Sequence, residues 1–169
     1  IIVVGLALAL AQFTSLDRLG GVNPPHTKTG LEEHILRNFA RYSRPHLQHA
    51  TNEWELLVSA QHHGVPTRLL DWSYSPLVAA HFATLGDQDV DRVIWRLDWK
   101  RMHRKFRFPE LALLIDDLHR LVGRDGQFTP WRLIDEASKV KPFACMIEPP
   151  TLDARISAQT ATFTLCSDT

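Results

Sequence analysis

One short stretch of the chain gathers most of the side chains that could bind a ligand or transfer a group. From residue 61 to residue 72 it reads Gln-His-His-Gly-Val-Pro-Thr-Arg-Leu-Leu-Asp-Trp. Arg68 offers a planar fork of donors that suits a phosphate or a carboxylate, and Asp71 can orient that fork or accept from a ligand hydroxyl. Trp72 can stack on a flat ring, and His62 can serve as an acid or a base. A phosphate-bearing nucleotide fits this set of residue types best.

The backbone of the stretch is suited to holding these groups, but it also allows a purely structural interpretation. Gly64 permits a chain reversal that a side chain would obstruct, and Pro66 fixes the approach to Thr67. An arginine and an aspartate three residues apart beside a tryptophan often form an ion pair that only holds a loop in place. Spacing alone favours this structural role, because structural ion pairs shift the pKa values of ionisable groups just as functional sites do.

The stretch resembles the central signature of the FRG domain, a bacterial and phage module of poorly defined activity. The chain from Gln61 to Thr84 reads QHHGVPTRLLDWSYSPLVAAHFAT, and nearly every position to Ala83 matches. Two flanking segments, Thr14–Arg18 and Arg155–Gln159 followed by Phe163-Thr164, are similar to an early and a late element of the family. The resemblance therefore runs from about residue 13 to 166, across most of the chain. The Phe-Arg-Gly triplet that names the family is absent, and its expected register places Val4 where the arginine would be.

The resemblance, together with these residues, implies a ligand pocket with a set of assigned roles. The expected catalytic residues are His62, Asp71 and Gln159, and the expected ligand-binding residues are Gln61, Thr67, Arg68, Trp72 and Arg155. NAD is the cofactor expected for one candidate reaction, ADP-ribosyl transfer, and a missing arginine at Val4 puts that activity in doubt. Two alternatives stay open: a non-catalytic binding module of a bacterial or phage toxin or defence protein, and a degenerate inactive fragment.

The rest of the sequence predicts an α+β fold over residues 1–169, a single compact domain with about five helices around a small mixed sheet. Apolar spacing and capping signals predict helices near 29–44, 51–64, 75–86, 111–123 and 129–138. Thr29-x-x-Glu32 has the form of a capping box for the first of these. Strands are expected at 93–99, 143–147 and 162–166, and an ordered loop at 65–74. The apolar start, residues 1–11, is expected to be a strand or helix of the fold, because it is too short to span a bilayer.

Charge limits the partners that the chain can have. Nineteen Lys and Arg balance nineteen Asp and Glu, so a broad basic footprint for nucleic acid is absent. Basic residues interleaved with aromatic ones do cluster between Arg92 and Arg107, a pattern that can bind single-stranded nucleic acid. The neutral overall charge favours instead a solvated loop whose tryptophans belong to the core. Nucleic acid is therefore not the expected partner, and the oligomeric state is left open.

Histidines and cysteines add little to the predicted site. No metal site is predicted. His62 and His63 are adjacent, so their side chains diverge on a helix and cannot share one metal ion. His46 and His49 lack a third ligand at a recognised spacing. The two cysteines have no CxxC spacing, which predicts reduced thiols in a cytoplasmic protein without a membrane partner. The missing initiator Met and missing Phe-Arg-Gly suggest a domain that is atypical or truncated over residues 1–12.

Overall fold

The computed structural model describes residues 3–7, 13–43, 52–85, 93–115, 118, 122–123, 126–127, 129–138, 141–149 and 160–167. Its helices are η1 (a 3-10 turn, Asp17–Leu19), α1 (Lys28–Tyr42), α2 (Glu53–His62), α3 (Pro76–Thr84), α4 (Trp99–Phe106) and α6 (Pro130–Ser138). Its strands are β1 (Val3–Ala7), β2 (Leu69–Ser73), β3 (Val93–Leu97), β4 (Leu113–Leu114), β5 (Val122–Gly123), β6 (Gly126–Gln127), β7 (Ala144–Glu148) and β8 (Ala161–Cys166). The α+β class predicted from the sequence is confirmed.

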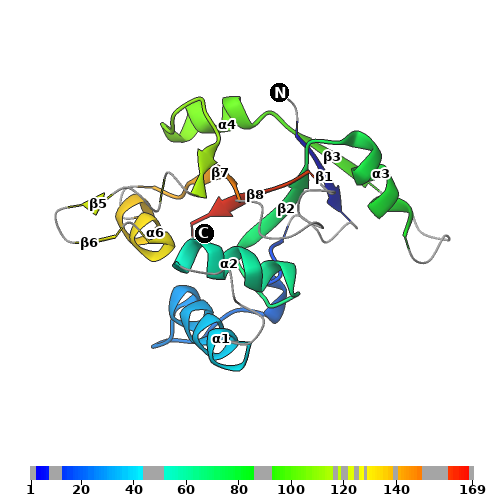
Figure 1. The fold of residues 1–169 in the computed structure, drawn as a ribbon. Helices are drawn as coiled ribbons and strands as arrows, with labels where there is room; N and C mark the ends of the chain where they lie inside the picture. Colours follow the sequence, from blue (N-terminus) through cyan, green and yellow to red (C-terminus); the bar gives the residue numbers. More distant parts are fainter. Residues whose placement is uncertain are drawn as a thin grey trace.

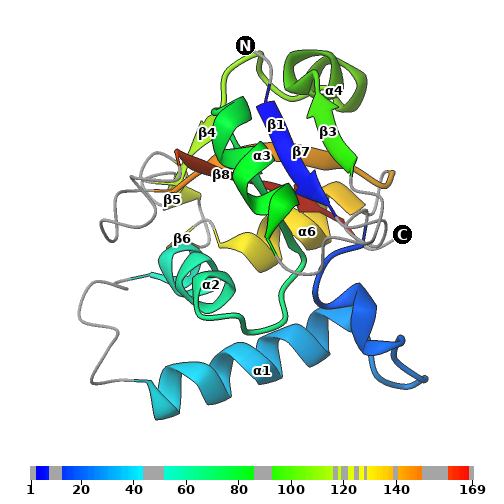
Figure 2. The ribbon, with the colours of Figure 1, turned by 90° about the vertical axis from the view of Figure 1, so that its right-hand side faces the viewer.

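The main sheet has the strand order β3-β1-β2-β8-β7-β4 and is mixed, because β4 and β7 are parallel while the other neighbours are antiparallel. β5 and β6 form a separate two-stranded ribbon. β2 runs through the interior of the sheet between β1 and β8, with Val4 of β1 opposite Ser73 and Leu69 opposite Leu165. Figures 1 and 2 show α1 and α4 at opposite ends of the molecule, with the sheet between them. The signature strand therefore sits at the centre of the fold.

The core divides into two layers because side chains alternate along each strand. On one face, Leu69, Cys145 and Phe163 join buried residues of α2 and α6 such as Leu57 and Ile134. The other face of the same strands carries a smaller cluster of Trp99 and Met146, with Trp72, Tyr74, Leu97, Met102 and Ala112 packed around it. β2 and β7 thus contribute apolar side chains to both layers.

Three of the sequence predictions are corrected by these elements. The expected loop at 65–74 contains β2, whose five residues all pair with β8; its two end residues are buried, and Asp71 in the middle is exposed, which hides the strand in the sequence. The expected helix near 111–123 begins instead with β4, where Leu113 and Leu114 pair with β7. The expected solvated loop after β3 is the helix α4, which buries Trp99 and His103.

Several helix boundaries were predicted correctly from capping residues. Asn52 caps α2 by accepting from the Glu55 N–H at 3.0 Å, and Ser75 with Pro76 begins α3. Gly64 follows α2 with φ +75°, a conformation that strains other residues. Among the described residues, no helix is both long enough and apolar enough to cross a bilayer.

One buried histidine links α4 to the sheet. The His103 Nε2 atom accepts from the Met146 N–H at 2.7 Å, so the proton must sit on Nδ1, which donates to the Pro109 carbonyl at 2.6 Å. The side chain is fully buried. Burial lowers the pKa of His103, while the bond to Pro109 opposes that shift. The fold therefore requires this imidazole to be neutral.

We expect the free energy of unfolding to fall as the pH drops below about 6.5, because the unfolded imidazole takes up a proton there while the folded one resists it. His103→Gln should flatten this part of the pH profile, since an amide neither titrates nor loses its acceptor. Urea denaturation at several pH values measures the slope, with exposed His26→Gln as the matched control. An unchanged slope in His103→Gln would show that His103 does not set it.

Candidate functional site

A chain of hydrogen bonds fixes the polar residues of the signature. The Thr67 hydroxyl donates to the Gln61 carbonyl oxygen Oε1 at 2.6 Å, and Gln61 Nε2 donates to Asp71 Oδ2 at 2.6 Å. Thr67 is fully buried, Gln61 lies in the last turn of α2 and Asp71 lies in the middle of β2. Because the first bond determines which end of the Gln61 amide is the donor, the second bond holds the Asp71 carboxylate in one orientation.

Asp71 is the member of this chain that reaches solvent. The residue is exposed, yet the surrounding protein removes its carboxyl from water enough to raise its pKa. The hydrogen bond from Gln61 and the charges of His62 and Arg18 act in the opposite direction. An oriented carboxylate, an imidazole and a guanidinium are thus within electrostatic reach of one another at the surface.

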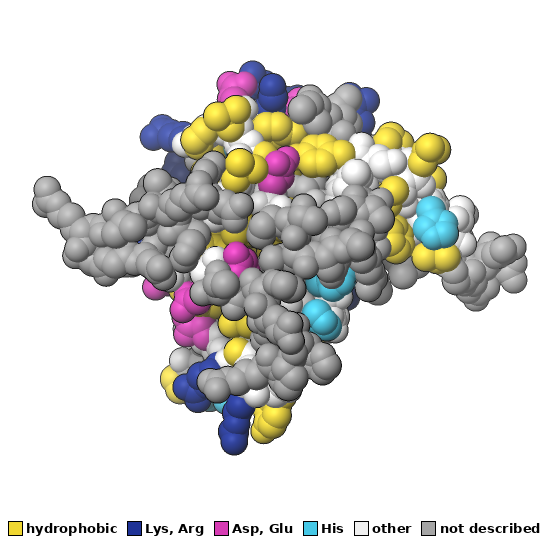
Figure 3. Space-filling view, viewed as in Figure 1, with side chains coloured by type: hydrophobic (Ala, Val, Ile, Leu, Met, Phe, Trp, Pro, Cys, Tyr) yellow, Lys and Arg dark blue, Asp and Glu magenta, His cyan; other side chains and the backbone are white. Residues whose placement is uncertain are grey.

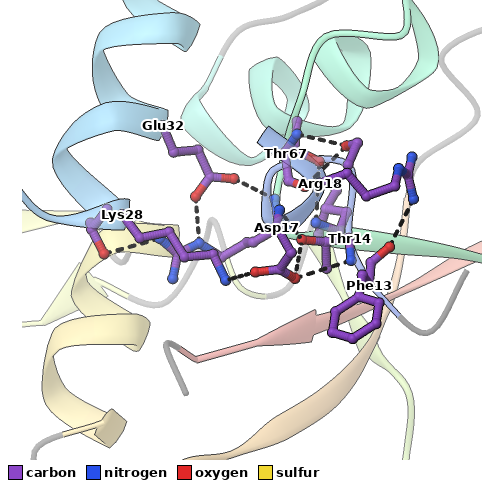
Figure 4. A network of polar contacts seen from close by, with 11 residues as sticks. Phe13, Thr14, Asp17, Arg18, Lys28, Glu32 and Thr67 are labelled. Carbon is purple, nitrogen blue, oxygen red and sulfur yellow. Dashed lines mark hydrogen bonds and ion pairs between the residues drawn. The ribbon is translucent and has the colours of Figure 1, made fainter. Parts of the chain in front are cut away.

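The early element Thr14–Arg18 is bound directly to the signature. The Ser15 hydroxyl donates to the Thr67 carbonyl at 3.2 Å and accepts from the Thr67 N–H at 3.0 Å, and the Leu16 N–H donates to the same carbonyl at 3.1 Å. Figure 4 shows Thr67 beside Thr14 and Asp17 of this element, together with the Asp17–Lys28 ion pair of 2.5 Å. Two segments that share a family resemblance but lie some fifty residues apart therefore meet in space.

Arg68 lies inside the protein. It has no exposed surface, and its Nε donates to Oε2 of Glu32, which is equally buried in α1. The Arg68 backbone N–H donates to Glu32 Oε1 at 2.7 Å, and Nη2 donates to the Thr29 hydroxyl at 3.0 Å. Burial raises the pKa of Glu32, and the charge and hydrogen bonds of Arg68 oppose that shift. This geometry favours a structural role for Arg68 over the ligand contact predicted from sequence.

The same contacts correct the predicted capping box. The N-cap of α1 is Thr27, whose hydroxyl accepts from the Gly30 N–H at 3.0 Å. Thr29 and Glu32 are spaced by three residues within the helix, so they lie on one face and both reach Arg68. The Thr-x-x-Glu pattern does not mark a helix start; its two side chains bind Arg68, the residue before β2.

The remaining predicted site residues are divided between different places. Trp72 follows Asp71 in β2 and so points to the opposite face, where its indole N–H donates to the Thr164 hydroxyl at 3.0 Å within the Trp99 layer. His62 is half-buried at the end of α2, with its ring 5.5 Å from that of His63. Arg155 and Gln159 lie outside the described residues.

Three residues that contact or lie near the signature were not among those predicted to be functional: Glu32, Arg18 and Ser15. The signal for Glu32 was the Thr29-x-x-Glu32 spacing, and the signal for the other two was the early element. In the part of the chain that the structure describes, no group of three or more His, Cys, Asp or Glu is placed to hold a metal ion. The polar residues that the structure brings together around Asp71 are Gln61, His62 and Arg18, and we call these four residues the Asp71 site.

We expect Arg68→Met to lower the free energy of unfolding by about 3–5 kcal/mol, because it leaves the Glu32 carboxylate buried without its partner. Urea denaturation measures the loss. Arg18→Gln is the matched control, since its exposed guanidinium should change stability by about 0.5 kcal/mol or less. A loss under about 1 kcal/mol for Arg68→Met would contradict the structural role.

Comparison with known proteins bears on the same segment. The family model of the FRG domain matches residues 9–92, about half of the chain. The match includes the early element, α1 with Glu32, and the whole signature, while the late element at 155–164 lies beyond it. A search of curated proteins and a search of solved structures each found no match. The chain belongs to the FRG domain family.

Proposed function

We propose that the Asp71 site binds the ribose-phosphate part of a nucleotide such as NAD. The observation that supports this most is the Asp71 carboxylate, which is open to solvent and held in one orientation by Gln61. Carboxylates in nucleotide sites accept hydrogen bonds from ribose hydroxyls. A carboxylate has about four lone-pair sites, so the bond from Gln61 leaves acceptor capacity for such a hydroxyl.

Arg18 supplies the positive charge that a phosphate requires at this site. Its side chain is exposed, and Nη1 donates to the Phe13 carbonyl at 2.8 Å, which steadies the guanidinium. Its effect on the pKa of Asp71 indicates that the two charges are near one another. A guanidinium has five donors, so one bond to the backbone leaves others for phosphate oxygens. Arg18 therefore takes the anion-binding role that the sequence assigned to the buried Arg68.

ADP-ribosyl transfer is the reaction that fits this arrangement. The bond between nicotinamide and ribose breaks, the electron pair leaves with nicotinamide, and a nucleophile of the acceptor forms a bond to the same ribose carbon. His62 would take the proton of that nucleophile, and Asp71 would orient the ribose. Val4 stands opposite Ser73 on the strand next to the signature, so an arginine at this position would join the same part of the sheet.

A non-catalytic binding module is the second candidate. It is supported by large apolar side chains left exposed on α3 and the edge strand β3: Leu77 at 82%, Ile94 at 48% and Trp95 at 40%. An apolar surface beside an open strand edge is a typical site for protein association. In this alternative the signature serves mainly to hold β2 in the sheet.

Isothermal calorimetry with NAD and with ADP-ribose tests the first proposal. We expect saturable binding that Asp71→Asn weakens about tenfold or more, because a hydrogen bond to a charged group contributes about 1.5–3 kcal/mol. Asp135→Asn, which alters an exposed aspartate of α6, is the matched control. A Val4→Arg variant should bind at least as tightly as the wild type.

The absence of binding by both the wild type and Val4→Arg would refute a nucleotide site. Equal affinity of Asp71→Asn and Asp135→Asn would show that the ligand binds elsewhere. If neither ligand binds while Leu77→Ser or Trp95→Ser disrupts association with another protein, the second candidate gains.

A further inference from the structure

A cavity at the end of α4 combines aromatic walls with positive charge. It has a volume of about 570 Å³ and lies between the last turn of α4 and the segment that precedes β7. Its rings are those of Phe106, Phe108 and Phe143, and its charged groups are those of Lys105, Arg107 and Lys141. No carboxylate is among the described residues that line it. The cavity therefore selects for an anion with a flat or apolar part.

The walls of this cavity are rigid. Phe143 is buried, and its N–H donates to the Ser167 hydroxyl at 2.8 Å while its carbonyl accepts from the Ser167 N–H at 2.9 Å. Phe108 packs against it with ring centres 5.5 Å apart, and the Phe108 N–H donates to the His103 carbonyl at 2.9 Å. A base entering the cavity would meet preformed ring surfaces, which lowers the entropic cost of stacking.

Arg107 is placed at the mouth of the cavity at a cost to the backbone. It follows α4 in the left-handed conformation with φ +62°, the position that glycine usually takes at a helix end. A residue with a side chain loses roughly 1–2 kcal/mol there. The chain thus carries a cation where glycine would be more stable, which indicates that the charge at this position has a use.

Positive charge continues from the cavity along the outer face of α4. Trp99 and His103 face the core, and the opposite side of the helix carries four cations: Lys100, Arg101, Arg104 and Lys105. Figure 3 shows Lys and Arg side chains gathered at this end of the molecule. Among the residues that the structure describes, the acidic ones bonded to this helix are Asp98, which caps α4, and Glu110, whose contact with Arg104 is exposed and 3.7 Å long. Exposed pairs of this kind contribute little, so the helix face stays positive.

The neutral charge of the whole chain does not cancel this local field. Charges more than about 10 Å apart are largely screened at 0.1 M salt, so carboxylates at the α1 end of the molecule have little effect at α4. The expected solvated loop would have left these cations without a fixed arrangement. The helix instead sets them in a row that leads to an aromatic cavity.

We infer that this surface binds single-stranded nucleic acid, with one base in the cavity and the phosphate backbone along the cations of α4. Single strands are held by this combination of a positive track and aromatic stacking positions. A duplex keeps its bases paired and could not place one in the cavity. This site is separate from the Asp71 site and does not depend on the proposed nucleotide function.

Fluorescence anisotropy of the full chain with labelled oligothymidylate and oligouridylate tests the inference, and the two probes distinguish DNA from RNA. We expect saturable binding whose affinity falls with salt, with a slope of about −0.7 per phosphate contact. Arg107→Gly should weaken binding about three- to tenfold and make the slope shallower by about 0.7, without lowering the melting temperature. Lys141→Gln should act in the same direction on affinity.

Arg41→Gln is the matched control, because Arg41 is also an exposed cation near the end of a helix, but it lies in α1. Four results would overturn the inference. They are no saturable binding, equal losses in Arg41→Gln and Arg107→Gly, equal affinity for a duplex of the same length, and full affinity for thymidine triphosphate alone. The last result would identify a small-ligand pocket in place of a strand-binding surface.

Discussion

The buried contact between Glu32 and Arg68 is the interaction on which the arrangement of the signature depends. Glu32 of α1 accepts from both the backbone and the guanidinium of Arg68, at the point where the chain enters β2. Two fully buried charges are costly to remove from water, and this cost is recovered only if every partner is in place. The pair therefore specifies how α1 docks against the sheet more than it adds net stability.

This contact lies next to a series of hydrogen bonds that ends at Asp71, the exposed residue in the middle of the same strand. Thr67 precedes Arg68 and bonds on one side to Ser15 and on the other to Gln61, which in turn orients Asp71. A buried ion pair, a buried hydroxyl, an amide and an exposed carboxylate thus form one connected series. Within the family signature, the buried Thr67 and Arg68 are structural, while Gln61, His62 and Asp71 lie nearer the surface, so both interpretations of the sequence apply to different residues.

The sequence was most informative where local physics decides the structure. Helix starts at Asn52 and Ser75 followed from capping residues, and the α+β class followed from the periodicity of apolar residues. Strand β2 was missed because Asp71 interrupts its apolar pattern and the polar Thr67 and Arg68 precede it, and only pairing with β8 makes the strand evident. The partner of Arg68 was missed for the same reason. Glu32 lies 36 residues away, and no spacing rule connects an arginine to a helix that packs against it through tertiary contact.

A double-mutant cycle on Glu32 and Arg68 tests most directly whether this pair organises the signature. Urea denaturation of Glu32→Gln, Arg68→Met and the double variant gives the coupling energy, and contacting residues in one network reach about 0.5–3 kcal/mol. We predict a coupling energy near the upper end of that range. The free energy of unfolding of the double variant should be at least as large as that of the less stable single variant. A coupling energy indistinguishable from zero would contradict the account, because it would mean that the two buried charges stabilise the fold independently.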